Sequence, residues 1–326
     1  MNALKPVRTR SQIISVLPVI RPRSLVPLQP AINRRTDPRP AIDWGQSKVL
    51  LGAYMAPLTT SSPLQFRFEL EPVDHIAPWG EDDDRKLHWF GLTDGRYWMV
   101  TPLGEALRYT DEKMKEWETQ SPYVDYQVAR FFEDLQIVLP SALEPVPADI
   151  AALVCQGGWL EHAEKRMSDL SDAGELREMY RDAMDWYIER SLDKMYLVDG
   201  PIFRFWRVGD QVNIRWEPSV RNPDDRWVLP QGEFTITSEQ FESAAYSFFH
   251  ELLNETGKRV AIIEAMGWRR QDCKVDAPSL VREQKQRTDW IGDLKRRQPK
   301  TDWGDVRRLV SSVSAELSIP DSTIKR

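Results

Sequence analysis

Residues 87–98 read Leu-His-Trp-Phe-Gly-Leu-Thr-Asp-Gly-Arg-Tyr-Trp, an aromatic run interrupted by Thr93-Asp94-Gly95. Two apolar arms on either side of an Asp-Gly pair are a strong hairpin signal, because glycine accepts the positive φ that a tight turn requires. We therefore expect two antiparallel strands joined at Asp94-Gly95. Large rings that each bury about 150–250 Å² would begin a sheet core here. They belong to Trp89, Phe90, Tyr97 and Trp98.

Alternating residues upstream and downstream extend this predicted sheet. Residues 66–70 read Phe-Arg-Phe-Glu-Leu, the period-two pattern of a strand with one buried face. A further short strand is expected at 105–109, directly after Gly104. Residues 64–109 therefore predict an antiparallel sheet of at least three strands.

A second hairpin is predicted between residues 202 and 216. Two alternating runs, 202–208 and 211–216, flank the pair Gly209-Asp210. Arginines interleave with tryptophans along both runs, as in proteins that stack nucleic-acid bases. A third strand is expected at 233–237, so these residues predict a second antiparallel sheet.

Helical periodicity occupies much of the remaining chain. An apolar stripe starts at Val124, recurs every three or four residues, and is closed by Pro140. Thr237 or Ser238 supplies an N-cap for a long helix that continues past Gly257. The expected helices are those at 124–138, at 148–155 before Gly157-Gly158, at 174–195, and from 238 to 266.

Composition divides the chain into three parts. Residues 1–63 contain nine prolines, which interrupt backbone ladders, so we expect a loosely ordered arm in which only 14–20 resemble an edge strand. Residues 64–267 carry the predicted sheets and helices. Residues 268–326 form a basic tail that is helical by composition. The predicted class is α+β, with antiparallel sheets built from hairpins and covered by helices.

The overall composition favours a cytoplasmic protein that needs no cofactor. Mean hydropathy is −0.51, and no apolar run reaches the roughly 18–20 residues needed to cross a bilayer. Cys155 and Cys273 stand in dissimilar contexts, so we expect no disulfide and a reducing compartment. The familiar zinc-binding spacings are absent. We therefore predict no metal, although His75 and His88 flank an acidic run at 82–84.

Charge is distributed unevenly and favours a cationic protein partner. The whole chain has a formal net charge of −6, to which residues 1–48 contribute +7 and residues 267–326 contribute +5. Residues 49–266 must therefore carry −18. An acidic surface attracts cationic partners and repels nucleic acid. Tryptophan and tyrosine also dominate interface hot spots, and this chain has 13 tryptophans. The predicted binding residues are Trp79, Asp82, Asp83, Asp84, Trp89 and Asp94.

Catalytic signatures are weak by comparison. The sequence has no Gly-x-Ser-x-Gly, no Gly-x-Gly-x-x-Gly and no Walker loop. Asp94 and Asp125 could each act as a general base if buried beside a substrate. The alternative function is thus a hydrolase or transferase that uses these two carboxylates and a nearby arginine.

The basic tail leaves open a third function. Thr-Asp-Trp occurs at 288–290 and again at 301–303, and each copy resembles an N-cap that opens a helix. Residues 310–326 resemble the second helix, the turn and the start of the third helix of a helix-turn-helix, truncated within the recognition helix. Nucleic acid is therefore expected as a partner only through this tail, in a DNA-linked regulator.

Several motifs together resemble an uncharacterised bacterial family, a domain of unknown function. They are Phe66–Leu70, Leu87–Trp98, Tyr123–Tyr126, Leu143–Pro147 and Phe203–Arg207, and the resemblance covers about residues 64–267. It implies no established activity, cofactor or catalytic residue. The absence of catalytic motifs, the acidic surplus and the density of aromatic residues favour a non-enzymatic protein-binding module. Analogy of type suggests an immunity protein that neutralises a cationic toxin by occlusion.

Overall fold

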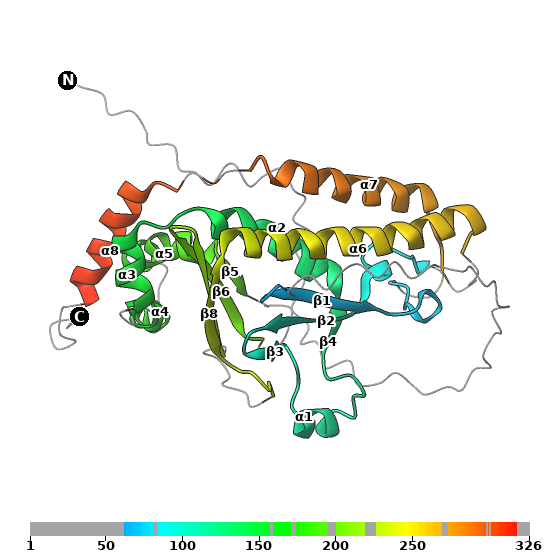
Figure 1. Ribbon diagram of the computed structural model, residues 1–326, viewed down its shortest axis with the longest axis horizontal. Helices are drawn as coiled ribbons and strands as arrows, with labels where there is room; N and C mark the ends of the chain where they lie inside the picture. Colours follow the sequence, from blue (N-terminus) through cyan, green and yellow to red (C-terminus); the bar gives the residue numbers. More distant parts are fainter. Residues whose placement is uncertain are drawn as a thin grey trace. The chain divides into compact units, whose positions relative to one another are not determined.

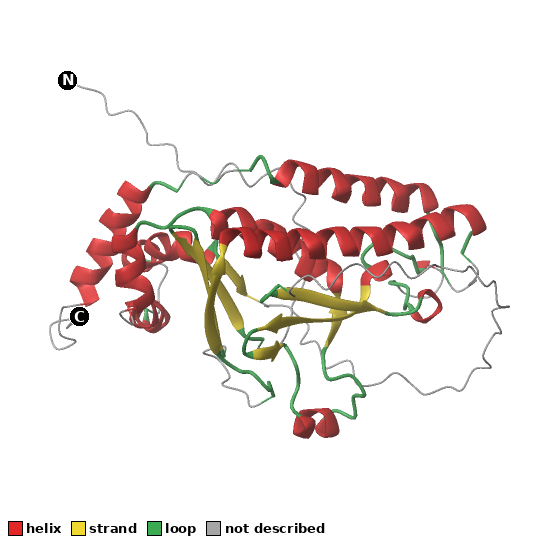
Figure 2. Cartoon of the chain, viewed as in Figure 1, coloured by secondary structure: helices red, strands yellow, loops and turns green. Residues whose placement is uncertain are grey.

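The computed structural model describes residues 62–80, 84–156, 159–170, 174–193, 200–218, 226–268, 273–297, 299 and 301–317. Within these ranges the chain has the predicted α+β architecture, with two antiparallel sheets and covering helices (Figure 2). The proposed arm, except Ser62 and Pro63, lies outside the described residues. So do Asp82 and Asp83, and the last part of the helix-turn-helix-like tail.

The first sheet is built around strand β2 (Asp94–Thr101). On one side β2 pairs with β1 (Gln65–Leu70), and on the other with β3 (Gly104–Ala106) and β4 (Val124–Gln127), always antiparallel. Residues 64–109 therefore contain three strands of an antiparallel sheet, as expected, but the hairpin arm expected at 87–92 is not one of them (Figure 1). Val124 was predicted to begin a helix but lies in β4. The helix α2 (Val128–Leu143) begins only afterwards and continues past Pro140.

The predicted turn at Asp94-Gly95 is wrong. Residues 91–93 form the short 3₁₀ helix η4 (Gly91–Thr93), and β2 starts at Asp94, so Gly95 lies inside a strand. The hairpin turn instead joins β2 to β3, where Gly104 has a φ of 129°. A Cβ on Gly95 would lie 2.2 Å from the carbonyl oxygen of Glu69. This glycine is required because two strand backbones approach closely, and not because a turn needs positive φ.

The second sheet confirms the other predicted hairpin. Its strand order is β5 (Ser191–Asp193), β6 (Ile202–Val208), β7 (Gln211–Glu217) and β8 (Gly232–Thr237). The β6–β7 turn contains Gly209 with a φ of 64°, which glycine adopts without steric cost. β8 leads into helix α6 (Ser238–Met266), where Thr237 and Gln240 form a capping box.

One hydrophobic cluster joins both sheets to helices α2, α6 and α7 (Ala277–Leu294). Alternate residues of β1 and β2 point toward the helices, and the Tyr97 ring stacks on Phe131 of α2 with centroids 5.0 Å apart. The Phe131 ring in turn lies 5.2 Å from Phe248 of α6. Helix α7 runs beside α6 (Figure 1) and contributes buried side chains to the same cluster. They are Leu280, Ile291 and Leu294.

A second cluster contains helices α3 (Ala148–Gln156), α4 (Trp159–Asp169), α5 (Glu175–Ile188) and α8 (Trp303–Leu317). Trp206 of β6 packs into it from the second sheet. Helix α5 is shorter than predicted, because Leu192 belongs to β5. Sequence patterns did not predict α4, the short α1 (Asp111–Glu116) or the 3₁₀ helix η2 (Val73–His75).

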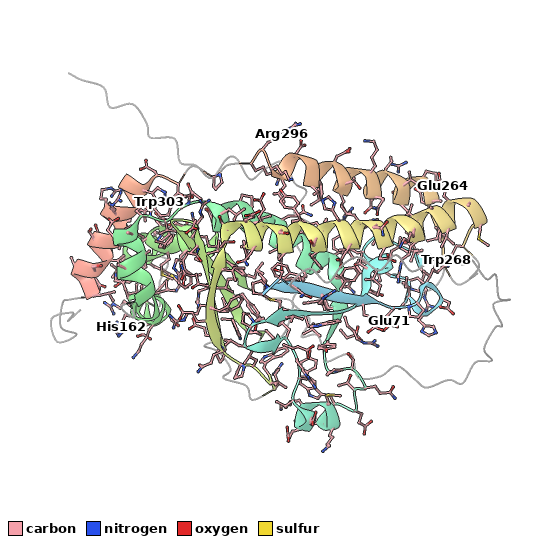
Figure 3. All side chains as sticks on the ribbon, viewed as in Figure 1. Glu71, His162, Glu264, Trp268, Arg296 and Trp303 are labelled. Carbon is pink, nitrogen blue, oxygen red and sulfur yellow. The ribbon has the colours of Figure 1, made fainter. Side chains whose placement is uncertain are left out.

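A buried ion pair connects α8 to this part of the fold. Arg190 is fully buried, and its guanidinium lies 2.6 Å from the Glu144 carboxylate at the end of α2. The same carboxylate accepts a hydrogen bond from the backbone N–H of Thr301 at 2.9 Å. The centre of the Trp303 ring lies 5.3 Å from the guanidinium carbon of Arg190, and Trp303 is labelled in Figure 3. The pair therefore fixes the start of α8 against α2 and α5.

Two helices of the structure lie beyond the expected boundary between residues 267 and 268. Helix α7 belongs to the first cluster, and α8 buries Val306, Val310 and Val313 in the second. Of the two Thr-Asp-Trp copies, only the second starts a helix, where the Asp302 carboxylate accepts from the N–H of Asp305 at 3.0 Å. The first copy lies within α7, since its neighbours continue the packing of that helix against α6.

Candidate functional site

The segment that connects β1 to β2, residues 71–93, carries most of the predicted binding residues. The backbone N–H of Glu71 donates to the carbonyl of Asp94 at 2.8 Å, so the segment leaves and rejoins the sheet at adjacent positions. Between these ends it contains η2, an isolated β-bridge and η4. We call this segment the 71–93 loop.

Arg259 of α6 holds the two ends of the 71–93 loop together. Its guanidinium donates to the Leu92 carbonyl at 2.8 Å and to the Glu71 carbonyl at 2.7 Å. Burial lowers the pKa of Arg259, while Glu255, Asp94 and Glu71 act in the opposite direction. The Glu71 side chain, labelled in Figure 3, also pairs with Arg96 at 3.0 Å. The base of the loop is therefore fixed by charge-assisted hydrogen bonds.

The outer part of the loop is closed by a β-bridge between Trp79 and Lys86. The N–H of Trp79 donates to the Lys86 carbonyl at 3.0 Å, and the N–H of Lys86 donates back at 2.7 Å. Within this bridge Gly80 has a φ of 114°, a conformation that favours glycine. The exposed Asp84 carboxylate lies 3.2 Å from the Lys86 ammonium and 3.9 Å from that of Lys274. Asp84 is thus held at the surface beside Lys86, the bridge partner of Trp79.

Trp79 is an exposed aromatic residue with aromatic neighbours. It is 38% exposed, and its ring centroid lies 5.6 Å from that of His88 and 6.3 Å from that of Phe90. The Arg130 guanidinium of α2 stands 4.7 Å from the centre of the Phe90 ring. We define the Trp79 surface as Trp79, Asp84, Lys86, His88 and Phe90. It combines the exposed Trp79 and His88 rings and the half-buried Phe90 ring with one described carboxylate and one ammonium group.

Trp89 does not belong to this surface, although it was predicted as a binding residue. It is fully buried, and its indole Nε1 donates to the Gln284 side chain of α7 at 2.8 Å. The Arg287 guanidinium lies 4.0 Å from the centre of the Trp89 ring. The ring therefore fills the space between the 71–93 loop and α7. A partner could reach it only if these elements separated.

Asp94 is also largely enclosed, with 8% exposure. It accepts a hydrogen bond from the Gln127 side chain at 3.2 Å across the β2–β4 pair. Asp125 of β4 is paired with Arg96 of β2, which lies two residues after Asp94. Because side chains alternate between the two faces along a strand, Asp94, Arg96 and Asp125 all lie on one face of the sheet. Asp125 is exposed, unlike Asp94. The two carboxylates of the alternative enzyme therefore share a face but differ in solvent access.

The sequence analysis did not identify His88, Phe90 or Arg259 as site residues. His88 and Phe90 lie within the aromatic motif at 87–98, but they were expected to form part of a hairpin strand and not a surface beside Trp79. Arg259 stands in a helical run, and nothing in its local sequence marks its contact with the loop. The tripeptide Gly-Lys-Arg at 257–259 lacks the glycine and Ser/Thr positions of a phosphate-binding loop.

The described ranges contain no group of three or more His, Cys, Asp or Glu side chains placed to hold a metal ion. Among the same residues, no helix is both long enough and apolar enough to cross a membrane. Cys273 is partly buried and packs against the first cluster.

Comparisons with known proteins give one match. A family model described as a family of unknown function (DUF5984) matches residues 65–309. No curated protein and no solved structure matches the chain. The matched range extends beyond residue 267, the limit expected from the sequence motifs, through α7 and into α8. This agrees with the packing of both helices into the two clusters.

Proposed function

Given that the chain belongs to the DUF5984 family of unknown function, we propose that it is a non-enzymatic protein-binding module. Its Trp79 surface docks a cationic protein partner. The observation that supports this most directly is the exposed Trp79 ring on a loop whose two ends are joined through Arg259.

The properties of the Trp79 surface match those of interface hot spots. Tryptophan contributes a large contact area and loses little conformational entropy on binding. The β-bridge with Lys86 and the contacts with His88 and Phe90 place the ring before a partner arrives. A preorganised anchor of this kind loses less free energy on association than a mobile one.

The charge around this surface supports a cationic partner. Glu81, Asp82, Asp83 and Asp84 are consecutive in the sequence, directly after Trp79 and Gly80. Residues 49–266 carry −18 overall. Such a surface raises the association rate with positively charged proteins, and the effect weakens with salt. Within this class we propose a toxin that the module neutralises by occlusion.

Affinity capture from the native host, followed by binding measurements on the recovered partner, tests the proposal. Trp79→Ala should weaken binding at least tenfold, because a central aromatic anchor contributes about 1.4 kcal/mol or more. Asp84→Lys should lower the association rate and its dependence on salt. The matched control is Ile137→Ala on α2, since Ile137 is an exposed apolar residue outside the 71–93 loop.

Two results would contradict the proposal. One is a recovered partner whose affinity is unchanged by both Trp79→Ala and Asp84→Lys. The other is an acidic partner whose binding is strengthened by salt. Neutralisation is tested separately by expressing the toxin with the wild-type chain or with Trp79→Ala, and the variant should protect the cells less.

A further inference from the structure

Strand β1 forms one edge of the first sheet. Within the described part of the chain it pairs with β2 alone, from Gln65 opposite Val100 to Leu70 opposite Gly95 (Figure 1). An edge strand presents a row of backbone donors and acceptors that another strand can pair with. The chemistry of this edge therefore depends on which groups point outward.

The backbone N–H and C=O groups that point away from β2 are those of Phe66, Phe68 and Leu70. The bond from the Glu71 N–H to the Asp94 carbonyl makes this couple a directly hydrogen-bonded pair of the ladder. Hydrogen-bonded and non-hydrogen-bonded pairs alternate in an antiparallel ladder. The backbone groups of residues 65, 67, 69 and 71 therefore bond to β2, and those of residues 66, 68 and 70 face away from it.

The side chains of the same strand alternate in chemistry. Phe66, Phe68 and Leu70 point toward the helices, but Phe68 and Leu70 are only partly buried. Arg67 and Glu69 are exposed on the opposite face. A groove of about 170 Å³ runs between the start of β1 and α6. It is lined by Leu64, Phe66, Ser243, Ala244, Ser247 and Phe248, among others.

We propose that β1 pairs antiparallel with β1 of a second copy of this chain, with a two-fold axis at Phe68. In this register Phe68 bonds to the partner's Phe68, and Phe66 bonds to the partner's Leu70. Every outward backbone group from 66 to 70 is then satisfied. The partner's Leu70 lies beside Phe66, next to the groove on α6.

Charge complementarity selects this register and this occupant. Pairing about Phe68 places Arg67 opposite the partner's Glu69, at the positions where cross-strand side chains approach most closely. The partner strand could also shift by two residues in either direction and still form backbone hydrogen bonds. A shift in one direction would place Arg67 opposite the partner's Arg67, and a shift in the other would place Glu69 opposite the partner's Glu69. Like charges directly opposite each other are unfavourable.

Charged residues on an edge strand commonly prevent association. They do so when the charges repel an approaching strand or leave it without counter-charges. The segment Phe-Arg-Phe-Glu-Leu instead has opposite charges placed symmetrically about its centre. The same segment therefore repels shifted registers and accepts a second copy in one register.

Sedimentation of the full chain over a range of concentrations tests the dimer. The wild-type protein should dimerise, whereas Arg67→Glu alone and Glu69→Arg alone should each weaken self-association at least tenfold. An equimolar mixture of the two variants should form a heterodimer, since every cross-strand pair then joins opposite charges. The double variant Arg67→Glu/Glu69→Arg should dimerise again for the same reason.

The mixture also separates pairing from folding. Glu69 lies 3.6 Å from Arg96 in its own chain, so Glu69→Arg changes a local ion pair as well as the edge. Thermal unfolding of each variant measures that effect. Lys258→Glu on α6 is the control, because it reverses an exposed charge away from the edge and should leave dimerisation unchanged.

Hydrogen exchange identifies the paired residues. The amides of Phe66, Phe68 and Leu70 should gain protection as the protein concentration rises. A wild-type chain that stays monomeric overturns the proposal, as does a dimer that both single variants leave intact. Protection of these three amides in a monomer would show that a segment of the same chain covers the edge, and it would also overturn the proposal.

Discussion

The indole Nε1 of Trp89 donates a hydrogen bond of 2.8 Å to the side-chain oxygen of Gln284. The same oxygen accepts from the Thr256 hydroxyl at 2.9 Å, and the Gln284 amide donates to the Leu253 carbonyl at 2.8 Å. One glutamine thus connects the 71–93 loop, α6 and α7. This explains why α7 belongs with the sheets and not with a separate tail.

Gln284→Leu should destabilise the fold by about 2–3 kcal/mol, because it leaves the buried Trp89 N–H without an acceptor. The free energy of unfolding, measured with urea, gives this difference. Gln286→Leu is the matched control on the same helix, since Gln286 is exposed and its loss should change stability by less than about 0.5 kcal/mol. Equal effects of the two substitutions would exclude the connecting role of Gln284.

Gly95→Ala should destabilise the protein by about 3 kcal/mol or more, since its Cβ would lie 2.2 Å from a backbone oxygen that cannot move aside. Gly292→Ala in α7 should have the opposite sign. No atom lies within 4 Å of that added Cβ, and alanine favours helix by roughly 1 kcal/mol over glycine. Denaturation midpoints of both variants provide the comparison. A stable Gly95→Ala protein would contradict the observed register of β1 and β2.

Arg259→Lys should loosen the 71–93 loop while the second cluster stays intact. Lysine has no planar fork of donors, so one ammonium group cannot replace both bonds to Leu92 and Glu71. We expect faster hydrogen exchange at Trp79, Lys86 and Leu92, by about tenfold. Lys258→Gln, at the exposed neighbouring position, should leave these rates unchanged. Uniformly faster exchange throughout the chain would indicate a global effect instead.

Ionisation of Tyr109 should lower the free energy of unfolding at alkaline pH. Burial against its surroundings raises the pKa of Tyr109 to about 12, with Arg226 acting in the opposite direction. The unfolded chain releases this proton near pH 10 while the native state keeps it, so stability falls as pH rises from about 10 to 12. The loss attributable to this group is at most about 3 kcal/mol.

The variant Tyr109→Phe should remove that part of the alkaline loss. Urea denaturation at pH 8, 10 and 12 measures it, and the pH 8 value serves as the reference for each protein. If the wild-type chain and Tyr109→Phe lose stability equally between pH 10 and 12, the hydroxyl of Tyr109 does not contribute.

Elements that depend on neighbouring residues were predictable. The β6–β7 hairpin follows from alternation around Gly209-Asp210, and the start of α6 follows from the Thr237 cap. The β1 strand follows from its alternating pattern. In each case the residues that determine the structure lie within a few positions of one another, so local turn chemistry and side-chain periodicity were sufficient.

The candidate site was predicted less completely. Trp79 and Asp84 lie at the surface as expected, but Trp89 is buried against α7, far away in the sequence. Neither the periodicity nor the composition of residues 87–98 distinguishes a ring that faces solvent from one that faces a distant helix. Arg259 was missed for the same reason, since its two acceptors belong to another part of the chain.

The α+β class, the second hairpin and the alternation of β1 follow from the order of the residues alone, because they depend on short-range geometry. Packing between distant segments places Gly95 within a strand, encloses Trp89 and puts the first Thr-Asp-Trp copy inside α7 instead of at a helix start. Each of these outcomes depends on how closely distant backbones and side chains approach. Steric exclusion and hydrogen-bond satisfaction between such partners are properties of the folded chain and not of any local stretch.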